Sequence, residues 1–442
     1  MKLYLKITVL LIIHIINRME KLIGYKINDD YILLKCLGDG SFATVWMCYS
    51  LKAKNYYAMK IQNVDDYEEG QKEINVLKKI SETKCLYLNT LISSFEYKFK
   101  ILKHGENSIC MVFPLLAGSL DDIMRYGVLS KGLPYDSVKK IFYQLLVAVN
   151  TLHKSVEVIH TDIKPDNILL SGVSIENKKL IDKLKECWKL NNPHLRQKKL
   201  TSLLFENQDI DSETYDSDES DSDVSTDSEY SDEEYHIILD NDDSSENSDS
   251  NYDSDDEMTE LIIDHNDIIN PIIKLSDFGS CLPVDTLKRR EIQTRYYRAP
   301  EVMLGCDYNL TCDIWSIGCT IYELLTGELL FDPDKSIFFN RDQYHLLNMI
   351  CLLGPIPDKL ITTGRRSHMF FSNKLLRGID ISVINDTYNQ TLPLEQLIKQ
   401  VGSEKIPPKD QVFFVDLIVQ MICYENRITI EQALKHPYFS TQ

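Results

Sequence analysis

Two short polar runs, about a hundred residues apart, constrain this chain more than any other feature. The first, residues 160–170 (HTDIKPDNILL), sets out a carboxylate, a lysine and an amide at Asp162, Lys164 and Asn167. The second, residues 277–279 (DFG), supplies another carboxylate followed by a flexible glycine. Any fold that uses both runs for one purpose must bring them together across the long intervening segment.

The residue types in these runs match what phosphoryl transfer from Mg·ATP requires. Asp162 would accept or orient the proton of an acceptor hydroxyl, and Lys164 would neutralise the phosphoryl group during transfer. Asn167 and Asp277 would bind Mg²⁺. The structural alternative is that the run is only a polar turn between a helix and a strand. Six of its eleven residues match the pattern of a phosphoryl-transfer loop, which argues against this alternative. His160 is expected to pack and to form hydrogen bonds rather than to act as an acid or base.

A glycine-containing loop between two strand-like segments is the candidate phosphate-binding loop. Ala43 stands where a third glycine is usual, and a plain hairpin turn is the alternative. Lys60 ends an apolar run on the next strand, where its ammonium can reach the α- and β-phosphates, and Glu73 on the following helix is placed to pair with it. We therefore expect ATP to bind here. The loop residues assigned to ATP binding are Leu37, Gly38, Asp39, Gly40, Ser41, Phe42, Ala43, Thr44 and Val45.

Hydrophobic periodicity predicts an α+β fold, with a small β-rich lobe followed by a larger helical lobe. The first lobe contains one segment of helical spacing, residues 66–80, and residues 176–190 could form a further helix. Strands are expected at 31–37, 43–48, 56–61, 109–113 and 268–273, and helices of the second lobe at 137–152, 313–325 and 411–423.

The segment between the two polar runs is extremely acidic. From Asp209 to Glu260 it contains 23 acidic residues, twelve serines and no Lys or Arg. Of the 67 acidic residues in the chain, the other 44 stand against 48 Lys and Arg, so the net charge of −19 belongs to this segment. The near-neutral remainder predicts no direct binding of nucleic acid. The acidic segment has too little apolar content to fold alone.

In this order, the motifs resemble the eukaryotic protein kinase family over about 31–170 and 270–440. The resemblance implies a bilobal fold, ATP and Mg²⁺ as cofactors, and protein substrates. It also implies that Glu301, in an Ala-Pro-Glu run, pairs with Arg427, and that Asp313 steadies the backbone of the catalytic loop.

The resemblance divides the chain into five parts: an N-terminal extension at 1–30, the N-lobe at 31–116, the first part of the C-lobe at 117–172, an acidic and largely disordered spacer at 173–269, and the second part of the C-lobe at 270–442.

Finer features indicate the subgroup. Lys164, two residues after Asp162, is typical of serine/threonine kinases, and the Tyr-Arg-Ala-Pro-Glu run at 297–301 resembles the CMGC group. Thr294 resembles the threonine that bridges Asp162 and Lys164, so we expect it to brace the catalytic site. Within this group the chain is most similar to the SR-protein kinases, which also carry a long spacer at this place.

At three positions the chain departs from the pattern of related kinases, and each departure predicts something about regulation or substrate. Thr161 stands where many kinases have an arginine that pairs with a phosphate on the activation segment, and threonine cannot make that contact. We therefore expect activity without phosphorylation at Thr286 or Thr294. Tyr344 and Cys351 stand where SR-protein kinases have acidic docking residues, which leaves an Arg/Ser-rich substrate open. Glu328 keeps one such charge.

Other features concern location and partners. Eleven scattered cysteines with no CxxC pair predict reduced thiols and a cytoplasmic protein, with nuclear shuttling left open. The apolar stretch 3–16 is too short for a stable membrane span, and translation from Met19 or a targeting role are both open. A monomer is expected. The acidic segment is read as a linker, as a target of another kinase, or as a competitor for basic substrates.

The rival to an active enzyme is a pseudokinase-like scaffold that recruits basic partners through the acidic insert. Pseudokinases usually lose the strand lysine, the catalytic aspartate or the metal-binding aspartate, whereas this chain has Lys60, Asp162 and Asp277. The sequence therefore favours an active enzyme.

Overall fold

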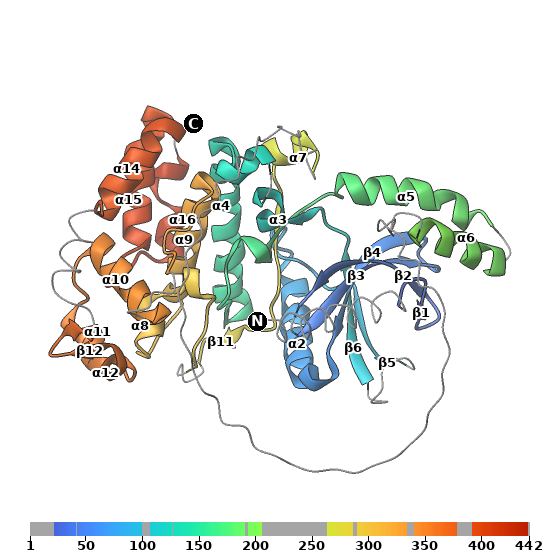
Figure 1. Cartoon of the computed structure of the whole chain (residues 1–442), viewed down its shortest axis with the longest axis horizontal. Coiled ribbons are helices and arrows are strands. Elements are labelled where there is room, and N and C mark those ends of the chain that lie inside the picture. The colour runs from blue at the N-terminus through green and yellow to red at the C-terminus, as the bar shows by residue number, and fades with distance from the viewer. Residues whose placement is uncertain are drawn as a thin grey trace, which may run out of the picture.

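The computed structural model describes residues 22–40, 42–99, 107–125, 127–190, 193–205, 263–285, 290–333, 340–377 and 391–440. Four subjects of prediction lie outside these residues: most of the N-terminal extension, Ser41, the acidic segment 209–260 and Thr286. The described chain forms two lobes, an N-lobe built on a β-sheet and a larger, mostly helical C-lobe (Figure 1).

The N-lobe is built on one antiparallel sheet with the strand order β1-β2-β3-β4-β6-β5. Helix α2 (Tyr67–Thr83) packs against this sheet through Ile74, Leu77 and Ile80, which are buried as their spacing predicts. Leu22 and Ile27 are also buried in this lobe, so it begins before the expected boundary. The strands are β1 (Lys26–Ile27), β2 (Tyr31–Asp39), β3 (Ala43–Ser50), β4 (Asn55–Gln62), β5 (Ser93–Lys98) and β6 (Asn107–Pro114).

The C-lobe is helical and surrounds α9, which is apolar on nearly all sides and therefore buried. Trp315 of α9 stacks on Phe331 with ring centroids 5.6 Å apart. Burying a side chain of this size stabilises the lobe by about 1.5–3 kcal/mol. The helices are α3 (Leu120–Met124), α4 (Tyr135–Thr151), α7 (His265–Ile269), α8 (Pro300–Met303), α9 (Thr311–Thr326), α10 (Arg341–Leu353), α11 (Asp358–Thr363), α12 (Ser367–Phe370), α14 (Leu394–Lys405), α15 (Pro408–Met421) and α16 (Ile430–Leu434).

Short strands bring the two polar runs together. Strand β9 (Ile168–Leu170) pairs antiparallel with both β10 (Ile273–Leu275) and β7 (Gly118–Ser119), although about a hundred residues separate β9 from β10. The catalytic-loop run thus ends beside the start of the Asp-Phe-Gly run. Other short strands are β8 (Val158–Ile159), β11 (Leu282–Pro283), β12 (Phe371–Ser372) and β13 (Leu375–Leu376).

The strand predicted at 268–273 is wrong in its first part. Ile268 and Ile269 end the short helix α7, and β10 begins only at Ile273. The cause is local, because the side chain of Asp264 accepts a hydrogen bond from the backbone N–H of Asn266 and caps this helix. The predicted helices of both lobes are confirmed, with their ends shifted by a few residues.

Three described helices lie within 173–269, the range expected to be the spacer: α7 at its end, and two longer helices near its start. Helix α5 (Ile175–Trp188) confirms the predicted helix at 176–190, and α6 (Pro193–Phe205) follows it. Both α5 and α6 pack on the N-lobe sheet, at the end where β2, β3 and β4 lie (Figure 1). No helix among the described residues is long and apolar enough to span a bilayer.

Candidate active site

Asp313, at the start of α9, holds the backbone of the catalytic loop (the run 160–170) through hydrogen bonds. Its carboxylate accepts hydrogen bonds from the N–H groups of His160 and Thr161, at 2.9 and 3.0 Å, and contacts Nε2 of His153 at 2.8 Å. Asp313 is fully buried, which alone would raise its pKa, but the contacts with His153 lower it below the usual value. The expected role of Asp313 is confirmed, and His160 is a packed, hydrogen-bonded residue.

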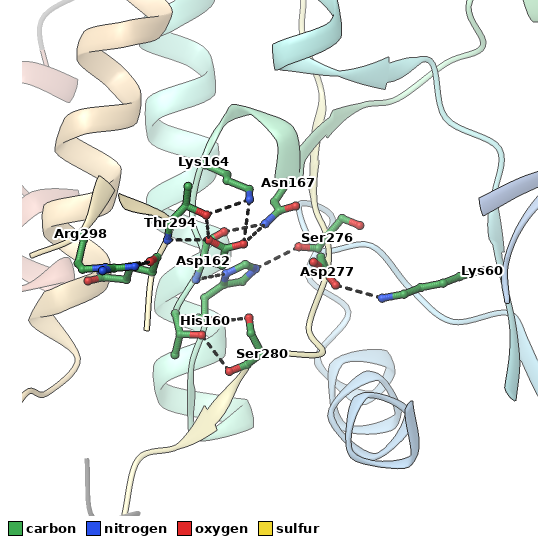
Figure 2. A network of polar contacts seen from close by, with 12 residues as sticks. Lys60, His160, Asp162, Lys164, Asn167, Ser276, Asp277, Ser280, Thr294 and Arg298 are labelled. Atoms are coloured by element: carbon green, nitrogen blue, oxygen red, sulfur yellow. Dashed lines mark hydrogen bonds and ion pairs between the residues drawn. The ribbon is translucent and has the colours of Figure 1, made fainter. Parts of the chain in front are cut away.

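Asp162 lies at the centre of a network that joins the catalytic loop to the activation segment (Figure 2). Its Oδ1 accepts hydrogen bonds from the N–H and the hydroxyl of Thr294, at 3.1 and 2.7 Å. Its Oδ2 lies 3.1 Å from both Nζ of Lys164 and Nδ2 of Asn167. Lys164 also donates to the hydroxyl of Thr294 at 3.0 Å, so this threonine bridges the two residues as the family resemblance implies.

Lys60 connects the N-lobe to the Asp-Phe-Gly run. Its Nζ lies 2.9 and 2.8 Å from the two carboxylate oxygens of Glu73 and 3.0 Å from Oδ1 of Asp277. Burial disfavours the ammonium, but the two carboxylates outweigh it and raise the pKa of Lys60. Burial likewise opposes the charge of Asp277, yet Lys60 holds the pKa of that carboxyl below its usual value. Lys60 and Asp277 are therefore both ionised at neutral pH, as nucleotide and metal binding require.

The glycine loop lies directly above this lysine. Strand pairing places Val45 opposite Lys60 and Gly38 opposite Val45, so the turn between β2 and β3 extends past the ammonium. Phe42 in the turn is largely exposed, and its carbonyl accepts a hydrogen bond from Asn63 at 2.8 Å. The described loop residues thus lie next to Lys60, on the side of the sheet where a bound phosphate would be covered by them.

Asn167 and Asp277 fit the predicted magnesium site. The amide nitrogen of Asn167 donates to the carbonyl of Asp162 at 2.8 Å and to its side chain, which leaves the amide oxygen as the end that can ligate a cation. Oxygen donors of this kind, together with phosphate oxygens, are what Mg²⁺ prefers. Among the described residues no group of three or more His, Cys, Asp or Glu side chains forms a metal site by itself. Such a site would need the phosphates of the nucleotide as further ligands.

Sequence reasoning missed a residue that shapes the activation segment, Gln293. Its side-chain amide donates to the carbonyl of Cys312 and the hydroxyl of Ser316, at 2.9 and 2.8 Å, and accepts from the N–H of Ala299 at 3.0 Å. Gln293 has a positive φ of 68°, an uncommon backbone conformation that these three bonds hold in place. Arg298 donates to the carbonyl of Gln293. The sequence around Gln293 does not predict these bonds, because two of the partners of its side chain come from α9.

Three carboxylates at the catalytic loop were also missed: Asp166 within the loop itself, Asp121 in α3, and Glu323 in α9. Burial raises the pKa of Glu323 to about 7, with further contributions from Asp121 and Asp166. Burial also raises the pKa of Asp166, against the effect of Lys164. The hydroxyl of Tyr297 donates to Glu323 at 2.6 Å. Because each residue comes from a different element, only the fold brings them together.

The Ala-Pro-Glu run makes the predicted structural ion pair. Nη1 and Nη2 of Arg427 lie 2.7 and 3.2 Å from the two carboxylate oxygens of Glu301. Both residues are buried, and the guanidinium also stacks over Trp315. This pair holds the end of the activation segment against the C-lobe core.

Comparisons with known proteins agree with this geometry. The protein kinase domain family matches residues 31–185 and 258–439. The serine/threonine-protein kinase SRPK of Physarum polycephalum is 28% identical, over 95% of this chain and 88% of its own length. Protein kinase dsk1 of Schizosaccharomyces pombe is 30% identical, over 78% and 69%. L205 of Acanthamoeba polyphaga mimivirus, which is named as a serine/threonine-protein kinase, is 29% identical, over 94% and 88%. The chain therefore belongs to the protein kinase family and is a serine/threonine kinase similar to the SR-protein kinases.

Proposed function

We propose that this protein transfers the γ-phosphate of Mg·ATP to serine and threonine hydroxyls of proteins. The observation that carries this proposal is that the nucleotide-binding group around Lys60 and the catalytic group around Asp162 are both assembled in the same structure. Lys60 contacts Glu73 and Asp277, while Asp162 is held by groups from two segments that are far apart in sequence. A scaffold that only bound nucleotide would not need the catalytic group.

Each residue then has a distinct role. Asp162 accepts or orients the proton of the acceptor hydroxyl, and Thr294 keeps its carboxylate in position. Lys164 lies within reach of the phosphoryl group and balances its charge. Lys60 binds the α- and β-phosphates beneath the glycine loop. Asn167 and Asp277 would hold Mg²⁺, which offsets the negative charge of the phosphates when it is bound.

We also propose that the substrates are basic near the acceptor residue. The support comes from the carboxylates of Asp121, Asp166 and Glu323. Burial raises the pKa of Asp166 and of Glu323, and the charge of Asp121 adds to both shifts, so a nearby cation would favour the ionised forms of these two groups. The surface of α10, where the SR-protein kinases have acidic docking residues, gives less support for a basic substrate. Cys351 is buried and Tyr344 is half-buried and uncharged, so neither supplies the acidic contact of the SR-protein kinases. We therefore place the basic preference next to the catalytic loop rather than at α10.

A peptide-array assay with the purified full chain tests both statements. The array carries serine and threonine peptides that contain arginine, glutamate or neither beside the acceptor. We expect labelling of arginine-containing peptides and at least a hundredfold loss with Asp162→Ala, because general-base and positioning effects are of this size. Asp162→Ala should still bind Mg·ADP. Equal labelling by both proteins would contradict the assignment of Asp162, and a preference for acidic peptides would contradict the substrate class.

A further inference from the structure

The described part of the chain crosses between the lobes in two places. The first crossing is the hinge after β6, which includes Leu115 and leads into β7. The second leaves β9, which is anchored in the C-lobe by its pairing with β7 and β10. Within a few residues of Leu170 the chain enters α5, whose first turn is capped by Ser174, and α5 packs on the N-lobe (Figure 1). Helices α5 and α6 thus form a strap that runs from β9, at the end of the catalytic-loop run, to the sheet.

The strap is held by a buried apolar cluster. Leu184 and Cys187 of α5 and Leu200 of α6 are fully buried against the sheet. Their partners on the sheet come from β2 and β3, and the hinge residue Leu115 borders the same cluster. These partners are Ile32, Leu34, Met47 and Tyr49. Since apolar burial of this kind is what fixes one element on another, the strap is a packed part of the N-lobe.

Trp188 makes the most specific contacts of the strap. Its indole ring stacks on Tyr49 of β3, with ring centroids 4.0 Å apart and planes 6° from parallel. Its Nε1 donates a hydrogen bond to the hydroxyl of Tyr56 of β4 at 2.7 Å. Tyr49 and Tyr56 are themselves opposite each other in the β3–β4 pairing. One side chain therefore clamps both strands that carry the nucleotide-binding groups.

The clamp lies on the sheet face that carries Lys60. Side chains on a strand alternate between faces, so Tyr56, Ala58 and Lys60 share one face of β4, as Tyr49, Met47 and Val45 share it on β3. Lys60 is thus four residues along the same row from Tyr56. The stack at Trp188 and the nucleotide site are two ends of one short stretch of sheet.

We propose that the strap positions the nucleotide-binding part of the N-lobe over the catalytic loop, with Trp188 as the positioning residue. Because the strap is anchored at β9, it fixes the distance and orientation of β3 and β4 relative to the catalytic loop. The glycine loop and Lys60, which these strands carry, are fixed with them. The binding energy of ATP is then not spent on ordering these groups. This inference rests on the proposed function only in taking Mg·ATP as the ligand.

Kinetics of Trp188→Ala test the inference, with Lys183→Ala as the control, because Lys183 lies on the exposed face of α5. For Trp188→Ala we expect the KM for ATP and the Kd for Mg·ADP to rise about tenfold, the equivalent of ~1.4 kcal/mol. The kcat at saturating ATP and the KM for peptide should change less than about twofold, because the catalytic loop lies outside the strap contacts. Trp188→Phe keeps the stack and should recover most of the loss.

Hydrogen exchange of the unliganded proteins gives a readout that does not depend on nucleotide. We expect faster exchange in residues 37–47 and 56–61 of Trp188→Ala, and no change in Lys183→Ala. If Trp188→Ala matches Lys183→Ala in both exchange and ATP affinity, the strap proposal is overturned and the proposed function stands. If the wild-type protein binds no Mg·ATP, the proposed function falls, and exchange alone decides on the strap. If Trp188→Ala fails to fold, the same comparisons are made with Trp188→Phe, for which we expect about a twofold effect.

Discussion

Glu323 is a carboxyl group whose charge changes near neutral pH. Burial raises its pKa to about 7, and the neighbouring Asp121 and Asp166 add to the shift, against the hydrogen bond from Tyr297. Below this pKa the group is protonated and neutral, and above it the group is ionised. A cationic substrate side chain should therefore bind better as the pH rises from 6 to 8.

This gives a pH-dependent prediction for the KM of an arginine-containing peptide. In the wild-type protein the KM should fall severalfold between pH 6 and pH 8. In Glu323→Gln, which keeps an acceptor for Tyr297 but cannot ionise, the KM should stay near its low-pH value. A peptide without arginine serves as the control. Parallel pH profiles of the two proteins would show that Glu323 does not contact the substrate cation.

At the scale of elements, the activation segment is tied to the catalytic loop without a phosphate. The hydroxyl of Thr161 donates to the carbonyl of Ser280 at 2.9 Å, and Asp277 lies only three residues before it. Thr161 has a positive φ of 71°, which is uncommon for a β-branched residue and is held by Asp313. Thr161, which stands where many kinases have the phosphate-binding arginine, thus makes a direct hydrogen bond to the residue after the Asp-Phe-Gly run.

We therefore predict that phosphatase-treated protein is active. Thr161→Val keeps the shape of the side chain but removes the hydrogen bond, and should lower kcat about three- to tenfold, as one hydrogen bond of ~0.5–1.5 kcal/mol allows. Thr161→Ser keeps the hydroxyl and is the matched control. Steady-state assays of the three treated proteins make the comparison. Activity that appears only after phosphorylation of Thr286 or Thr294 would refute the prediction.

The same scale shows what the sequence could and could not predict. The proximity of residues within one motif, such as Asp162 and Asn167, was predictable because a local turn sets their spacing. Long amphipathic helices such as α4 were identifiable from their period. The docking of α5 was not, because its apolar stripe says that Leu184 is buried but not against which surface. Gln293 and Glu323 were missed for a related reason, since their partners come from elsewhere in the chain.

At the scale of the whole molecule, the charge is divided between two very different parts. The 23 acidic residues between Asp209 and Glu260 give the chain its net charge of −19, while the remainder has slightly more Lys and Arg than acid. The acidic segment is joined to α6 of the N-lobe at one end and to α7 of the C-lobe at the other. It is therefore tethered to the body that carries the active site, and its field acts on any charged substrate that approaches.

The sign of the salt dependence distinguishes the ways in which this segment can act. If it draws basic substrates toward the protein, the KM of an arginine-rich peptide should rise severalfold as salt increases from about 0.05 to 0.5 M, because screening shortens the Debye length from about 14 to about 4 Å. If instead it competes with the substrate for the docking surface, the KM should fall with salt.

We predict the first result, since 23 uncompensated negative charges attract a basic peptide before it reaches any docking surface. A protein in which residues 207–261 are replaced by a neutral linker of similar length should lose most of this salt dependence and keep its kcat. A neutral peptide controls for effects of salt on the active site itself. The opposite result would be a KM that falls with salt in the full-length protein but not in the protein with the neutral linker. It would show that the acidic segment competes with basic substrates and so inhibits its own kinase.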